Sequence, residues 1–139
     1  MNSNFMKYLS IIGLLALFIA ACSAKKLLTI QTVPEAETAD SISYELIVLD
    51  PGFDSWFYSQ AKSPNFHSQT YYENWNQQYV NAWNYERIGY RHSNVIHGSI
   101  DYDSSVDYGL EINHKLFYYF MYVENKLGIR LLANGPKSF

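Results

Sequence analysis

Residues 108–127 read YGLEINHKLFYYFMYVENKL, and this stretch decides the fold because it predicts the helix on which the rest must pack. At 100° per residue, one arc of that helix carries Ile112, Leu116, Tyr119, Phe120, Val123 and Leu127. The other sides of its middle turns carry Phe117, Tyr118, Met121 and Tyr122. A helix that is apolar all round is either central in its domain or partly covered by a partner. Both interpretations stay open: a central helix whose Tyr hydroxyls are bonded or reach solvent, and a partner-binding surface formed by those last four residues.

A strand is predicted upstream of this helix, over residues 42–49. Tyr44, Leu46 and Val48 alternate with more polar neighbours, which is the two-residue period of a strand with one buried face. A single strand leaves its own amides unpaired, so it needs a partner strand. The candidates are residues 95–100 and residues 129–132.

Two more helices are predicted between the strand and residue 108. Asp50 as N-cap and Pro51 at the first position favour a short helix after the strand. Thr70 and Glu73 form a capping box that opens a long helix, which is expected to end at Gly89. The fold class is therefore α+β: a small, mostly helical single domain over residues 42–132, with about three helices and a short two-stranded sheet. Residues 133–139 are expected to form a C-terminal tail.

Composition narrows the possible functions. The chain has 139 residues, of which 48% are hydrophobic and 17% aromatic, far too apolar for a disordered protein. Its net charge of −3 argues against a nucleic-acid partner, because phosphate binding needs clustered Lys and Arg. A single cysteine excludes both an intrachain disulfide and a site with several thiolate ligands.

The N-terminus predicts export and a lipid anchor. Lys7 followed by the apolar run at residues 11–21 is typical of a signal peptide, and the run is too short to span a bilayer. Ile19-Ala20-Ala21-Cys22 resembles the bacterial lipoprotein signal, which implies removal of residues 1–21 and diacylation of Cys22. We therefore expect the mature protein to contact the membrane through this anchor, because a multiply acylated cysteine binds a bilayer stably.

Residues 22–41 are expected to be the lipidated cysteine and a flexible linker. The 19 residues 23–41 would reach about 25 Å as a coil. No Asp follows Cys22 directly and no acidic cluster comes after it. By resemblance to bacterial sorting rules, this favours the outer membrane, facing the periplasm rather than the cell surface.

Ionisable side chains gather in residues 92–111. The pattern of Asp101, Asp103, Ser105 and Asp107 imitates the start of a calcium loop, but Val106 stands where the loop needs Gly. His92 and His97 of this region, with His114 just after it, lack the spacing of a zinc site. We therefore expect no metal and no cofactor, and expect the Asp residues to cap turns and the following helix.

A carbohydrate function is the alternative for the same segment. Asp107 and Glu111 lie four residues apart, so on one helix face they could act as general acid and base. Tyr102 and Asp103 could add an aromatic platform and a polar contact for a sugar ring. A glycan-binding or glycan-cleaving module built from Tyr102, Asp103, Asp107 and Glu111 therefore stays open.

Several strings resemble an uncharacterised family of small lipoproteins from Bacteroidota, a domain of unknown function. They are YELIVLDPGF at residues 44–53 followed by Trp56, SQTYYE at residues 68–73, IDY at residues 100–102 and VDYGLEIN at residues 106–113. The resemblance spans residues 43–131 and implies compartment and domain limits, but no catalytic residue. We expect a non-enzymatic envelope component that binds another protein through the aromatic helix or the loop before it.

Overall fold

The structure is a computed structural model that describes residues 28–34, 42–89 and 92–136. The predicted signal peptide, Cys22 and the tail residues 137–139 lie outside the described residues. The described elements, in chain order, are β1 (Leu28–Pro34), β2 (Ile42–Val48), α2 (Phe53–Gln60), the 3₁₀ helix η1 (Pro64–Phe66), α3 (Gln69–Ile88) and α4 (Leu110–Asn125). Three α-helices beside a two-stranded sheet confirm the predicted α+β class within this part of the chain.

The sheet is an antiparallel pair, β1 against β2, with Leu28 opposite Val48 and Ile30 opposite Leu46. The alternation predicted for the second strand is confirmed, since Leu46 is buried and Glu45 is exposed. The predicted partner strands are wrong, because β2 pairs with β1. Within residues 95–100 and 129–132, side chains of α3 and α4 bond to Gly98, Ile100, Leu131 and Leu132. The linker prediction is also wrong for Leu28–Pro34, because these residues form a strand and Leu28 is buried in the core.

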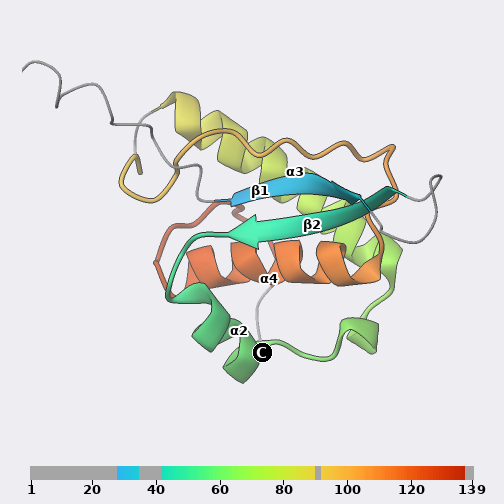
Figure 1. The fold of residues 1–139 in the computed structure, drawn as a ribbon. Helices are drawn as coiled ribbons and strands as arrows, with labels where there is room; N and C mark the ends of the chain where they lie inside the picture. The colour runs from blue at the N-terminus through green and yellow to red at the C-terminus, as the bar shows by residue number, and fades with distance from the viewer. Residues whose placement is uncertain (1–27, 35–41, 90–91, 137–139) are drawn as a thin grey trace, which may run out of the picture.

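Helix α4 is the centre of the molecule. It packs against α2, α3, η1 and β2 (Figure 1), and its side chains are buried continuously from Leu116 to Val123. The hydroxyl of Tyr118 accepts the Lys62 N–H at 3.0 Å, so at least one central Tyr is bonded from outside the helix. The central-helix interpretation is therefore confirmed.

Helix α3 lies along α4 and runs in the same direction. Tyr72 contacts Phe117, and further along Tyr79 stacks on Phe120 with ring centroids 5.0 Å apart. The helix ends at Gly89, as predicted, but its N-cap is Ser68, whose hydroxyl accepts the Tyr71 N–H. The capping-box prediction placed the start at Thr70, two residues too late.

The segment that returns from the end of α3 to the start of α4 is held by α3 side chains. The Trp83 indole donates to the carbonyl of Gly98 at 3.1 Å. The Asn84 amide both donates to the carbonyl of Ile100 and accepts its N–H. Both backbone groups of Ile100 are therefore bonded to a side chain and cannot pair with a strand. Residues 95–100 accordingly form no strand.

Candidate functional site

The predicted partner surface on α4 lies inside the domain. The exposed fraction is 5% for Phe117, 4% for Tyr118, 1% for Met121 and 3% for Tyr122. Trp56 of α2 covers Tyr118 and Tyr122 from outside, with ring centroids at 6.5 and 5.5 Å. These four side chains are core residues, so the prediction that they face a partner is wrong.

Tyr102, the predicted aromatic platform, is also buried. Its hydroxyl donates to Oδ1 of Asn113 at 2.9 Å, and its ring stacks on Tyr108 at 5.1 Å. Burial raises the pKa of Tyr102 above its ordinary value, so the hydroxyl remains a donor. A sugar ring cannot stack on a face that Tyr108 already covers.

The aspartates of the same segment cap turns, as the structural interpretation predicts. Oδ1 of Asp103 accepts the N–H and the hydroxyl of Ser105, and these bonds lower the pKa of Asp103. Oδ1 of Asp107 accepts the Gly109 N–H at 2.9 Å and the Gln69 amide at 2.7 Å. Both carboxylates therefore hold the entry to α4.

Asp107 and Glu111 do not share a helix face. Helix α4 begins at Leu110, after Gly109, whose φ of +80° is left-handed and favours glycine. Asp107 therefore lies before the helix, whereas Glu111 is exposed in its first turn. The geometric premise of the acid and base pair is wrong.

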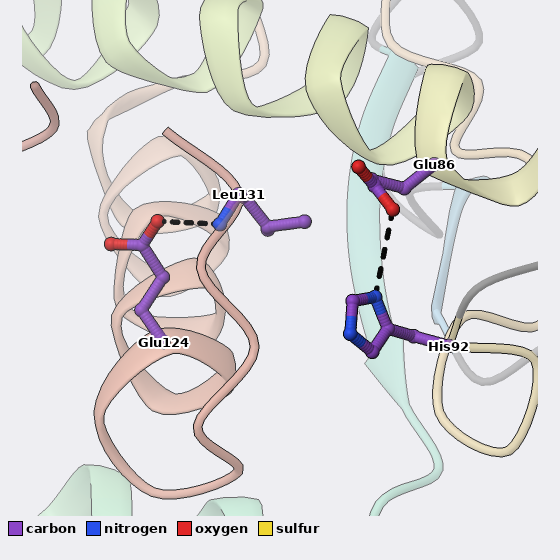
Figure 2. A network of polar contacts seen from close by, with 4 residues as sticks. All are labelled: Glu86, His92, Glu124 and Leu131. Atoms are coloured by element: carbon purple, nitrogen blue, oxygen red, sulfur yellow. Dashed lines mark hydrogen bonds and ion pairs between the residues drawn. The ribbon is translucent and has the colours of Figure 1, made fainter. Parts of the chain in front are cut away.

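The histidines are held separately. His97 contacts the Asn94 carbonyl at 3.0 Å and His114 contacts the Lys62 carbonyl at 2.9 Å, each through Nε2. Nδ1 of His92 lies 3.5 Å from Oε2 of Glu86 (Figure 2). Within the described ranges, no group of three or more His, Cys, Asp or Glu side chains gathers around a possible metal position.

A buried polar cluster, missed by sequence reasoning, joins α3 and α4. Asn76 and Asn113 are both 0% exposed, and the Asn76 amide donates to the backbone carbonyl and to Oδ1 of Asn113. The Asn113 amide donates to the Gly109 carbonyl at 3.0 Å. The available signal was that Asn76 falls within the apolar arc of α3, between Tyr72 and Tyr79.

A carboxylate of α4 ties down the C-terminal segment. Oε1 of Glu124 accepts the N–H groups of Leu131 and Leu132 at 2.9 Å, and Figure 2 shows the first of these bonds. Oε2 accepts the Tyr79 hydroxyl at 3.1 Å. These bonds keep residues 129–132 from forming a strand. Glu124 also lines a hollow of about 660 Å³ at this end. Because both oxygens of its carboxylate already accept these hydrogen bonds, the carboxylate is not free to bind a ligand there.

A second hollow, of about 290 Å³, opens between β2, α2 and the first turns of α4. We call it the β2 groove. Its lining residues are Tyr44, Glu45, Leu46, Phe57, Tyr58, Glu111, Ile112, His114 and Lys115. Tyr58 is 85% exposed at its rim. Sequence reasoning missed this site, although Glu111 belongs to it.

The wall of the β2 groove includes a strand edge. Within the described residues β2 pairs with β1 alone, and an edge strand presents unpaired N–H and C=O groups. Burial lowers the pKa of His114, so its ring is neutral at pH 7. The exposed carboxylates Glu45 and Glu111 face one nearby ammonium, Lys115. The groove thus combines backbone hydrogen-bonding groups, aromatic rings and a slight negative charge.

Comparison with known proteins places the chain in a family. A family model described as a family of unknown function, DUF6146, matches residues 9–135. The chain belongs to DUF6146. No curated protein and no solved structure matches this DUF6146 chain. None of the helices in its described part combines the length and hydropathy needed to cross a bilayer.

The strings quoted above from the sequence hold the DUF6146 fold together. In the first string, Oδ1 of Asp50 accepts the Gly52 N–H, and Phe53 is 0% exposed. Helix α2 starts at Phe53 with Gly52 as its N-cap, so the predicted cap at Asp50 is wrong by two residues. In the last string, Asp107 and Asn113 bond as described above. Asp50, Phe53, Asp107 and Asn113 therefore serve the structure, whereas other residues of the same strings, among them Tyr44 and Glu111, line the β2 groove.

Proposed function

We propose that this protein is a lipoprotein of the kind found in Bacteroidota and that it is anchored through Cys22. Its domain binds another envelope protein and catalyses no reaction. The β2 groove takes an extended segment of that partner as an added strand. Strand addition uses main-chain hydrogen bonds for affinity and neighbouring pockets for side-chain selectivity. The proposed location is the periplasmic face of the outer membrane.

One observation carries the binding proposal: a strand edge that no described residue pairs with lies beside Tyr58, an aromatic side chain that is 85% exposed. Exposed aromatic residues beside polar rims are typical of the anchors that dominate protein interfaces. Glu45 and Glu111 favour a partner segment that carries Lys or Arg next to an apolar residue. The lipid anchor is supported by the Ile19-Ala20-Ala21-Cys22 pattern.

The test is site-specific photo-crosslinking in cells that express the full chain. Tyr58 is replaced by a photoreactive phenylalanine derivative, and the adduct is identified by peptide mass spectrometry. The matched control carries the same group at Phe66, an aromatic residue that is 60% exposed on η1, outside the groove.

The expected result is a defined protein adduct from position 58 and none from position 66. The crosslinked peptide of the partner should contain a basic residue beside apolar ones. The variant Lys115→Glu should change the yield of the adduct formed at position 58. Equal adducts from both positions, or a glycan adduct at position 58, would contradict the proposal. Mass spectrometry of the same preparation should find Cys22 acylated.

A further inference from the structure

One end of the molecule gathers chain ends and exposed apolar side chains. Strand β1 begins there, β2 ends there, and α3 and α4 both end there, at the left of Figure 1. Five large hydrophobic side chains are exposed in the described part of the chain, and three of them belong to this end: Leu49, Tyr85 and Ile88. Their exposed fractions are 52%, 76% and 68%. Tyr85 and Ile88 are three residues apart in the last turns of α3, so they share one helix face.

The exposed charges are distributed unevenly between the two ends. Arg87, Lys126 and Arg130 are exposed basic residues at or just after the ends of α3 and α4. The exposed carboxylates Asp103, Asp107 and Glu111 lie instead around the start of α4, at the opposite end. At the first end, Glu86 lies against His92 and Glu124 is bonded to backbone, which leaves Asp54 in the first turn of α2 as an exposed carboxylate.

The tether sets how far this end can lie from a membrane. Because Leu28 already belongs to β1, at most residues 23–27 separate the folded body from Cys22. Six Cα steps from residue 22 to residue 28 span at most about 20 Å. Strand β1 starts at the same end of the molecule at which β2, α3 and α4 end (Figure 1).

We infer that this end is a membrane-facing surface, formed by Leu49, Tyr85, Arg87, Ile88, Lys126 and Arg130. The occupant is a lipid surface: the apolar side chains enter the headgroup region and the three cations meet anionic headgroups. The inference rests on the proposed acylation of Cys22, which brings the surface to the bilayer. It also leaves the β2 groove, with Tyr58 at its rim, free for a protein.

The experiment uses the full acylated chain in vesicles of phosphatidylethanolamine and phosphatidylglycerol. An Ile88→Cys variant carries a fluorophore on the new thiol, since the sulfur of Cys22 is occupied in the acylated protein. Phe66→Cys is the matched control, because Phe66 is also exposed but lies on η1. Tyr85→Cys gives a second reporter on the same face. Lipids with a quencher near the headgroup measure the approach of each fluorophore.

The expected result is quenching about twofold or more stronger at positions 88 and 85 than at position 66. Equal quenching in a preparation with acylated Cys22 overturns the membrane-facing surface and leaves the lipoprotein proposal intact. An unmodified Cys22, with a chain that does not float with the vesicles, overturns both. A label at position 88 that is unquenched in vesicles but protected in native membranes assigns the surface to a protein and also overturns the inference.

Discussion

Asp50 and Tyr122 lie 72 positions apart in the chain and are joined by a hydrogen bond of 3.0 Å from the tyrosine hydroxyl to Oδ1. The same oxygen accepts the Gly52 N–H at 2.9 Å. Burial raises the pKa of Tyr122 to about 12, and the bond to Asp50 acts in the same direction. One carboxylate oxygen therefore joins the turn after β2 to the central helix.

Gly52→Ala should destabilise the protein through this contact. A Cβ at position 52 would lie 2.6 Å from the Tyr122 hydroxyl oxygen, and such overpacking costs about 1–3 kcal/mol. The measurement is the free energy of unfolding in urea. In a Tyr122→Phe background the cost should fall by about 1 kcal/mol, since the clashing oxygen is gone. Gly89→Ala is the control, because its Cβ would lie 3.6 Å from the Glu86 carbonyl oxygen, an ordinary van der Waals contact. Strict additivity of the two substitutions would contradict this explanation.

Asn113→Ala should be strongly destabilising. It leaves the buried Tyr102 hydroxyl without its acceptor and removes the side-chain acceptor of the Asn76 amide, which keeps only its bond to the backbone carbonyl of residue 113. The expected cost is about 3 kcal/mol. Asn81→Ala, on the exposed side of α3, should change the unfolding free energy by less than about 0.5 kcal/mol. Similar losses for both variants in thermal or urea unfolding would argue against a structural role for the cluster.

Stability should depend on His114 in mildly acidic solution. Burial lowers its pKa in the folded state, so the unfolded chain binds this proton more readily. The contribution of neutral His114 to the free energy of unfolding is complete above the pKa of about 6.5 in the unfolded chain. It is lost as the pH falls below that value toward the pKa of the folded state. Urea unfolding between about pH 7.5 and 5.5 should show this slope, and His114→Gln should flatten it. Identical slopes for the two proteins would rule out His114 as the source.

Leu28→Ala tests whether β1 is part of the stable folded body. Leu28 is 2% exposed, so truncation should cost about 2–4 kcal/mol of unfolding free energy. Gln31→Ala, at an exposed position of the same strand, should cost less than about 0.5 kcal/mol. Equal and negligible effects would mean that β1 contributes nothing to stability.

The central place of α4 was predictable because periodicity and composition are local properties of the sequence. A segment that is apolar from residue 116 to residue 123 must be covered on every side. The sequence left open whether the cover was the chain itself or a partner. The structure supplies it from α2, α3, η1 and β2, which is why Phe117, Tyr118, Met121 and Tyr122 form no exposed site.

The partner of β2 could not be identified in the same way. Residues 28–34 are short and include polar Thr and Gln side chains, so their alternation gives a weak signal. The competing segments, residues 95–100 and 129–132, are held elsewhere by side-chain contacts: Asn84 bonds to Ile100, and Glu124 bonds to Leu131. Side-chain bonds of this kind leave no periodic pattern.

The sequence by itself determined the α+β class, the strand predicted over residues 42–49, the stop at Gly89 and the capping role of the aspartates before α4. Each of these depends on neighbours in the chain. Only the tertiary structure decided which strand pairs with β2, which aromatic side chains stay exposed, and that a groove opens beside Tyr58. These features depend on which surfaces meet in space. The free energy of burying apolar surface decides that, and it has no preferred direction and adds up over contacts between segments far apart in the chain.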